Sequence, residues 1–320
     1  MLLFWGLLVT YYFFLIGLKS SLKFMEVKSL KIDLVMWTFN GAKTLEPVLK
    51  QINSVIPESV VNQKIIVDDG STDQTVEVAE ACGWRVIRNE GRGISDGANT
   101  ALRHVETEWF CSFEQDLLLT PKWWSLISKW CGVAGVGAIS GMRFASQPKG
   151  LMALQNYVAK KYRGERYISS WLKSREISSF TLGKTLDNTF YFTESLRCIG
   201  GFPKLKTNAG VDTVLAYKLK QAGYEWLVDY TVRSIHLRNG LMDELKHQYS
   251  YGLQLKEIWR NVEVKAGVKP PINKFGVFSR LFISPLTGMF VAFKTGEPSV
   301  FLVHPLIRFY YTWGLLNSEF

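Results

Sequence analysis

The sequence has few cysteines and no paired-cysteine motif. Four cysteines (Cys82, Cys111, Cys131 and Cys198) stand far apart in 320 residues, and no C-x-x-C pair occurs. The chain also has no N-x-S/T sequon for glycosylation. We therefore expect buried thiols in a protein of a reducing compartment.

The basic residues lack the pattern of a nucleic-acid surface. Lys and Arg number 38 against 28 Asp and Glu, which gives a formal net charge of +10. No basic run is interleaved with aromatic residues at base-stacking spacing, so we expect no nucleic-acid partner. Anionic lipid headgroups or a diphosphate substrate would explain the surplus charge, and so would a general contribution to solubility.

The first apolar segment, residues 2–18, carries no charge. It lacks the positive start and the small-residue cleavage site of a signal peptide. About 17 apolar residues is the lower limit for crossing a bilayer, so residues 1–20 are predicted to form an uncleaved transmembrane anchor. Four lysines follow between residues 19 and 31. The positive-inside rule then places the next domain on the cytoplasmic side of the cell membrane.

A second apolar region lies toward the C-terminal end. Residues 275–293 and 299–316 are separated by "KTGEP", whose Gly and Pro predict a tight turn. We expect a transmembrane helical hairpin over residues 275–316. An interfacial hairpin is the alternative, because each half contains an Arg and the second a His, which are costly in lipid. Residues 241–272 form a mixed amphipathic segment, expected at the membrane interface or as a solvated helix.

The middle of the chain alternates strand and helix patterns. "KIDLVMW", "KIIVD", "WRVIR" and "EWFCSF" are typical of strands. Between them, "TLEPVLKQINSVI" places its apolar residues on one helical face, and "QTVEVAEAC" and "ISDGANTALRHVE" predict two further helices. Repeated β-α units indicate an α/β fold with a mainly parallel sheet and helices on both faces.

Polar stretches follow all four predicted strands: "TFNGAK", "VDDGSTD", "NEGRG" and "EQD". Ligands bind at the carboxyl ends of the strands in such sheets, so four polar loops at one edge predict a site. In "FEQDLLLTP", Asp116 can bind Mg2+ or Mn2+ directly, and Glu114 can reach the metal or a ribose hydroxyl. Simple capped or solvated turns are the alternative interpretation.

Taken together, these stretches resemble the family 2 glycosyltransferases over residues 31–240. The resemblance rests on "TFNGAKTLEPVL", "VDDGSTDQT", "NEGRGISDGANTAL", "FEQDLLLTP", "CIGGF" and "GVDTVLAYKLKQAGY", in that order. It implies a GT-A catalytic domain over residues 30–240 that uses a nucleotide-sugar donor and inverts the anomeric centre.

The resemblance also implies a role for individual donor-side residues. "EQD" falls on the family's DXD motif, with Glu114 in place of the first Asp, Gln115 between, and Asp116 as the safer ligand for Mg2+ or Mn2+. Asp69 would accept hydrogen bonds from the base, with Asp68 supporting it. The remaining residues expected around the nucleotide sugar are Trp37, Phe39, Asn40, Arg92 and Asn99.

On the acceptor side, "GVDTVLAYKLKQAGY" resembles a motif that commonly reads Glu-Asp, with Val211 in place of the Glu. Asp212 would be the general base, and a helix N-cap is the alternative. His236 ends the strand "VRSIH" and would contact the metal or diphosphate, or else be structural, and Arg238 could bind a phosphate. The basic segment 151–177 is expected to be an acceptor or lid loop, or a solvated helix.

The membrane segments refine the expected acceptor. Cellulose synthases carry a Q-x-x-R-W motif, which "QLKEIW" at 254–259 does not match. The chain looks more like a reduced cellulose-synthase-like enzyme or a relative of dolichyl-phosphate mannose synthase. By this analogy we expect transfer of mannose from GDP-mannose to a hydroxyl of a lipid-linked saccharide, ahead of glucose or N-acetylglucosamine from UDP.

Three other functions remain open at this point. A polyprenyl-phosphate acceptor would need no general base, because its nucleophile is already ionised. The altered "EQD" and Val211 would suit a non-catalytic membrane-tethered scaffold of the same fold. A nucleotidyltransferase would want a glycine-rich basic loop after the first strand, which "TFNGAKT" matches poorly.

Overall fold

The computed structural model describes residues 30–145, 184–205, 210–237, 240–266 and 274–318. The predicted anchor at 1–20, the basic segment 151–177 and Arg238 lie outside the described residues. All four cysteines are free. Cys111 is buried as expected, but Cys198 is exposed because it is the C-cap of the short surface helix α9 (Thr193–Arg197).

The described residues form one sheet of eight strands. The order across the sheet is β3-β2-β1-β4-β7-β6-β8-β5. The strands are β1 (Ile32–Thr38), β2 (Val61–Asp68), β3 (Arg85–Arg88), β4 (Trp109–Phe113), β5 (Leu117–Leu119), β6 (Val136–Ala145), β7 (Thr189–Phe192) and β8 (Glu225–His236). The predicted N-terminal strands β1 to β4 pair in parallel.

β6 and β8 also pair in parallel, so parallel pairings predominate as predicted, but the sheet as a whole is mixed. β7 runs antiparallel to both β4 and β6, and β5 runs antiparallel to β8. Only three residues separate β4 from β5. A parallel neighbour needs a crossover of a dozen residues or more, so β5 cannot pair in parallel with β4 and joins the far edge of the sheet instead.

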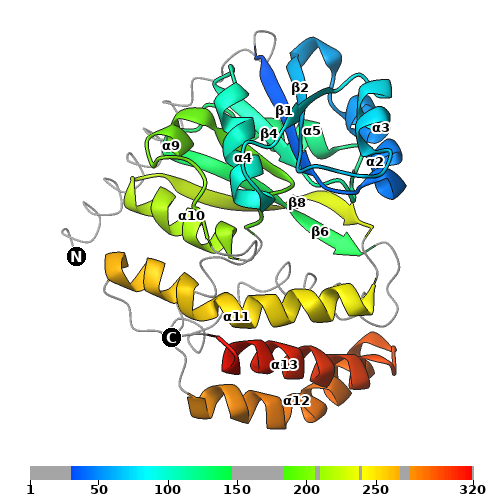
Figure 1. Ribbon diagram of the computed structural model, residues 1–320, viewed down its shortest axis with the longest axis vertical. Coiled ribbons are helices and arrows are strands. Elements are labelled where there is room, and N and C mark those ends of the chain that lie inside the picture. The colour runs from blue at the N-terminus through cyan, green and yellow to red at the C-terminus, as the bar shows by residue number, and fades with distance from the viewer. Residues whose placement is uncertain (1–29, 146–183, 206–209, 238–239, 267–273, 319–320) are drawn as a thin grey trace, which may run out of the picture.

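Helices cover both faces of the sheet, as predicted (Figure 1). α2 (Ala42–Val55), α3 (Thr75–Ala81) and α5 (Trp123–Ile127) pack on one face, and α4 (Gly93–His104), α9 and α10 (Val211–Gln221) pack on the other. Strand β1 shows why two cores form. Its alternate residues Ile32 and Leu34 join the first core, whereas Val35 joins the second, and all are fully buried. Short 3-10 turns lie at Glu58–Val60 and Ser128–Trp130.

Three C-terminal helices stack below the α/β domain (Figure 1). α11 (Leu241–Ala266) lies between that domain and α13 (Val300–Leu316), and α12 (Lys274–Thr295) packs against α13. The predicted hairpin is therefore present, with Gly296 at a φ of 68° in its turn. Within the described ranges, however, no helix has the length and apolar character needed to cross a membrane, so the spanning part of the prediction is not supported.

Several apolar side chains of α11 pack within the protein. Leu245 is 3% exposed and Leu255 is 9% exposed. The ring of Tyr249 lies 5.0 Å from that of Trp313 on α13. These side chains are not available to a bilayer, so an interfacial role for residues 241–272 gains no support from them.

Candidate functional site

The ends of β1 and β4 are joined by one side chain, Gln115. Its amide nitrogen donates to the carbonyl of Phe39 at 3.2 Å, and its amide oxygen accepts from the Phe39 N–H at 3.1 Å. β2 and β3 extend from one side of β1, and β4 lies on the other. The strand order therefore reverses between β1 and β4, which is where open α/β sheets bind ligands. Gln115 holds the loop after β1 at that point.

Three potential metal ligands meet beside this point. Glu114 and Asp116 lie in the turn between β4 and β5, and the β5–β8 pairing sets His236 opposite Leu117. The His236 Nε2 atom is 3.5 Å from Asp116 Oδ1 and 3.7 Å from Glu114 Oε2. One ligand atom from each residue lies within 4.8 Å of the others. The structure thus brings together the three residues expected to hold the metal.

The chemistry of this cluster fits a divalent cation. In the described part of the chain, His236 Nε2 is buried and has no hydrogen-bond partner. A buried ring nitrogen without a partner is costly unless something binds it. Carboxylate oxygens are the ligands that Mg2+ prefers, and Mn2+ accepts an imidazole nitrogen beside them. The cluster is therefore suited to hold either ion.

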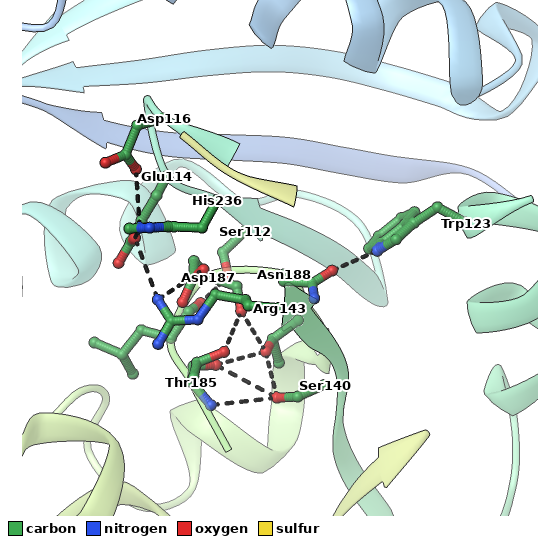
Figure 2. A network of polar contacts seen from close by, with 12 residues as sticks. Ser112, Glu114, Asp116, Trp123, Ser140, Arg143, Thr185, Asp187, Asn188 and His236 are labelled. Atoms are coloured by element: carbon green, nitrogen blue, oxygen red, sulfur yellow. Dashed lines mark hydrogen bonds and ion pairs between the residues drawn. The ribbon is translucent and has the colours of Figure 1, made fainter. Parts of the chain in front are cut away.

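Two residues missed from the sequence, Arg143 and Asp187, extend the cluster. Arg143 Nη1 lies 3.6 Å from Glu114 Oε2 and 3.4 Å from Asp187 Oδ2. Figure 2 shows the resulting row of ionisable groups, which runs from Asp116 through His236 and Glu114 to Arg143 and Asp187. A guanidinium beside these acids places positive charge next to the expected metal position.

The local fold explains how Asp187 reaches this position. It precedes β7 beside Asn188, which has a positive φ of 54° and is fully buried. The Asn188 side chain accepts a hydrogen bond from Trp123, and its carbonyl accepts one from Gly141 at 2.9 Å. Arg143 is the only charged residue in the strand "VGAISGMRFA". That isolated charge was the one signal in the sequence that could have revealed the pair.

Burial raises the pKa of the Asp187 carboxyl to about 6, although the positive charge of Arg143 lowers it. Replacing Arg143 by Ala would leave this carboxylate buried without its cation. We expect the free energy of unfolding to fall by up to about 3 kcal/mol. This is the low end for a broken buried ion pair, because the Arg143 side chain is 37% exposed and solvent screens its charge.

The Arg143→Ala loss should depend on pH. Without Arg143, the folded-state pKa of Asp187 moves further above its unfolded value, so stability falls as the pH rises above about 4. Denaturant titrations in EDTA at about pH 4.5 and pH 8 would measure this. The pair Arg143→Ala with Asp187→Asn should recover stability at the higher pH. An equal deficit at both pH values would contradict the explanation.

The two acids of "VDDGSTD" hold loops together. Asp68 is 8% exposed, and its Oδ2 atom accepts hydrogen bonds from the N–H groups of Gly70 and Ser71 at 3.0 and 2.9 Å. Asp69 accepts from the Asn89 side chain at 2.7 Å and from the Gly93 N–H, at the start of α4, at 2.9 Å. Both carboxylates therefore organise the loops around the expected base site.

The other donor-side residues occupy different environments. Phe39 is 54% exposed at the site edge, whereas Trp37 is 8% exposed and packs against Phe202. The Asn40 side chain accepts a hydrogen bond from the Thr72 N–H at 2.8 Å. Arg92 is the N-cap residue of α4.

Asn99 is fully engaged with backbone groups. Its amide nitrogen donates to the carbonyls of Ser95 and Phe202 at 2.8 and 2.9 Å, and its oxygen accepts from the Phe202 N–H at 2.9 Å. It therefore fixes the "GGF" turn and does not present its amide toward the expected donor position.

Asp212 lies in the first turn of α10. The N-cap residue is Gly210, with a φ of 81°, so the alternative interpretation of Asp212 as an N-cap is wrong. One of its oxygens accepts a hydrogen bond from the Thr213 N–H at 2.7 Å. Burial raises the pKa of the Asp212 carboxyl, and the charges of Arg143 and His247 partly offset this. A carboxylate with a raised pKa is a better proton acceptor near neutral pH.

The mixed α/β sheet, the helices on both faces and the acidic cluster at the carboxyl end of β4 fit the GT-A class of fold. Residues 33–185 match the family model described as glycosyl transferase family 2. The matched stretch spans strands β1 to β6 and makes up a little under half of the chain. A comparison with curated proteins finds no match.

Solved structures share this fold. Glucosyl-3-phosphoglycerate synthase from Mycobacterium tuberculosis, in complex with Mn2+, UDP and glucosyl-3-phosphoglycerate, has 17% identity and a TM-score of 0.53 over 76% of this chain and 82% of that chain. A mannosyltransferase from Pyrobaculum calidifontis, in complex with GDP-Man and Mn2+, has 16% identity and a TM-score of 0.53, with 95% of each chain covered. At this level of identity, the likeness shows the fold alone.

Proposed function

We propose that the protein transfers a hexose from a nucleotide-diphosphate sugar to an acceptor hydroxyl, with inversion at the anomeric carbon. The observation that carries this proposal is the cluster of Glu114, Asp116 and His236 at the β1/β4 reversal. Glu114 and Asp116 lie within the residues that match the glycosyl transferase family 2 model. Arg143 Nη1 lies 3.6 Å from Glu114 Oε2 of this cluster. Burial lowers the pKa of the Arg143 guanidinium, and the surrounding carboxylates, among them Asp212, raise it.

Each part of the site has a defined task in this reaction. Bound Mg2+ or Mn2+ would offset the negative charge that develops on the leaving nucleoside diphosphate. Asp212 takes the proton of the acceptor hydroxyl while the hydroxyl oxygen forms a bond to the anomeric carbon. The bond between that carbon and the phosphate oxygen of the donor breaks in the same step. The Gln115–Phe39 pair and Asp69 keep the nucleotide-side loops in place.

Mannose from GDP-mannose is the donor we propose. The Pyrobaculum mannosyltransferase, whose complex contains GDP-Man, aligns over 95% of both chains. The Mycobacterium synthase, whose complex contains UDP, aligns over 76% of this chain. The longer alignment supports the mannose donor, and UDP-glucose and UDP-N-acetylglucosamine are the competitors to test.

A screen of nucleotide sugars tests the proposed reaction. Detergent-purified protein would be incubated with GDP-mannose, UDP-glucose or UDP-N-acetylglucosamine and with Mg2+ or Mn2+, and the released nucleotide measured. We expect cation-dependent release from GDP-mannose. No release from any donor would favour the non-catalytic scaffold of the same fold.

We further propose that the acceptor is a lipid-linked saccharide and that the protein works at a bilayer with its catalytic domain on the cytoplasmic side. Nearly all exposed large hydrophobic side chains of the described residues lie on α12 and α13, and the exceptions are Phe39 and Met242. Phe282 and Phe293 are 79% and 83% exposed. An apolar surface this extensive marks an interaction site.

The charges on the hairpin suit a lipid surface. Lys294 lies near the end of α12 with its ammonium 5.6 Å from the centre of the Phe290 ring. Basic residues flanking an apolar face favour anionic lipids. The polar group expected to be costly, His304, is satisfied inside the hairpin, where its Nδ1 atom lies 3.1 Å from the Ser284 carbonyl oxygen.

Lipid photolabelling should therefore mark the hairpin. In membranes that contain a carbene-generating lipid, peptides from α12 and α13 are expected to be labelled, and peptides from α2 are not. Changing both Phe282 and Phe293 to Ser should reduce the α12 label several-fold, whereas Met242→Ser, an exposed apolar control on α11, should not. Equal labelling of α2 and α12 would contradict a bilayer contact at this face.

A further inference from the structure

Helix α11 presents two opposite faces to two different partners. On one face, Gly252 lies so close to α13 that an added Cβ would collide with backbone atoms of Tyr311 and Leu315. On the other face, a Cβ added to Gly210, the N-cap of α10, would overlap the side chain of Ile258. One side of α11 thus packs on the hairpin, and the other is turned toward the start of α10.

The face turned toward α10 is polar at its centre. His247, Tyr251, Gln254 and Ile258 follow one another at spacings of four, three and four residues, so they lie on one face of the helix. Burial raises the pKa of the Tyr251 phenol, as does the Asp212 carboxylate, whereas a hydrogen bond with Thr213 lowers it. His247 likewise acts on the pKa of Asp212. The hydrogen bond with Thr213 sets Tyr251 beside the residue that follows the proposed base.

Gln254 is the unusual member of this face. It is 2% exposed, yet in the described part of the chain both its amide oxygen and its amide nitrogen are without hydrogen-bond partners. Buried amides are almost always paired, because burial without a partner is costly. By contrast, Gln248 lies off this face and donates to Glu244 at 2.8 Å.

We infer that the acceptor saccharide binds to this face of α11 and that its reacting hydroxyl then lies next to Asp212. Gln254 is the central contact of this subsite, and Tyr251 lies beside it. The inference rests on the proposed function and names the residues that bind its acceptor. A primary amide offers two donors and one acceptor, which match neighbouring hydroxyls of a pyranose ring. An aromatic ring such as Tyr251 offers an apolar surface to such a ring.

The position of α11 gives the subsite a physical setting. Figure 1 shows α11 between the α/β domain and α13, against which it packs. A saccharide held on the side of α11 that faces α10 would therefore be one helix away from the hairpin. A lipid-borne sugar would need that arrangement, with its lipid at the apolar hairpin and its hydroxyl at Asp212.

The test uses Gln254→Leu, which keeps the size of the side chain and removes its polar atoms. The probes are n-octyl α-D-mannopyranoside and n-octyl β-D-glucopyranoside, with farnesyl phosphate as the ionised alternative. We expect the KM for the octyl glycoside to rise about tenfold, as the loss of one or two hydrogen bonds predicts. The Kd for the donor should not change, and the melting temperature should equal or exceed that of wild type, because an unpaired buried amide has been removed.

Gln248→Leu, on the same helix but off this face, is the matched control and should leave the KM within about twofold of wild type. An unchanged KM in Gln254→Leu, or a lower melting temperature as its sole effect, would make Gln254 a structural residue and overturn the inference. Transfer to farnesyl phosphate but to neither octyl glycoside would show that the acceptor is a phosphate and not a sugar hydroxyl. If wild type releases no nucleotide from any donor, the proposed function itself fails. This result can be told apart from the two outcomes above, because each of those requires an active wild-type protein.

Discussion

Asp116→Ala is expected to lower sugar transfer by about 10³-fold, because a bound cation supplies several kcal/mol of stabilisation to the charge that develops on the leaving group. Asp116 Oδ1 lies 3.5 Å from His236 Nε2 in the predicted metal site. The Ala variant would therefore lack one of the carboxylate ligands that the cation would use. Nucleotide release from the preferred donor, measured across a Mn2+ titration, gives both the rate and the apparent metal affinity.

The fold should survive this change. Glu114 and Asp116 belong to a cluster whose ligand atoms lie within 4.8 Å, and like charges at that distance repel in EDTA. The melting temperature of Asp116→Ala in EDTA is therefore expected at or above that of wild type. Glu46→Ala, which removes a 56% exposed acid paired with Lys50, is the control and should keep full activity. Wild-type turnover in Asp116→Ala, or in wild type with excess EDTA, would remove the metal from the mechanism.

Asp212→Asn is expected to lower transfer to a hydroxyl acceptor by about 10²–10⁴-fold, the usual contribution of a general base. The amide keeps the shape of the side chain but cannot accept the proton. The Kd for the nucleotide sugar, measured by calorimetry, should stay near that of wild type, so the loss belongs to the chemical step.

Stability measurements separate this chemical role from a structural one. Burial raises the pKa of the Asp212 carboxyl above its unfolded value. As the pH rises above the unfolded-state pKa of Asp212, ionisation of this buried carboxyl lowers the free energy of unfolding of the wild-type protein. The Asp212→Asn variant has no such ionisation and should not show this decrease. At neutral pH the variant should be at least as stable as wild type. Unchanged transfer in Asp212→Asn would instead favour an ionised phosphate acceptor, which needs no base.

The part of the fold that could be predicted is the part with local signals. Strands β1 to β4 have alternating β-α units, and Glu114, Asp116 and the loop "VDDGSTD" follow their carboxyl ends, so their convergence was predictable. The antiparallel strands β5 and β7 were not, because their partners β8, β4 and β6 are set by tertiary contacts and not by a short-range pattern.

The environments of several single residues could not be predicted from the sequence either, because they too depend on tertiary contacts. Asp187 and Gln254 occupy ordinary stretches of sequence, and only burial reveals that one is ion-paired and the other lacks partners. Asn99 was expected near the donor, but its distance from Phe202 in the sequence hid the three backbone hydrogen bonds that engage it. Apolar composition predicted the α12–α13 hairpin but did not determine whether it crosses a membrane.

The anomeric configuration of the product tests the central claim most directly. Wild-type protein with Mn2+, GDP-mannose and n-octyl α-D-mannopyranoside would be allowed to react, and the new linkage determined by NMR spectroscopy. A single in-line displacement assisted by Asp212 converts the α-linked donor into a β-linked product, and this is the predicted result. An α-linked product, or no transfer from any nucleotide sugar to any acceptor, would contradict the account.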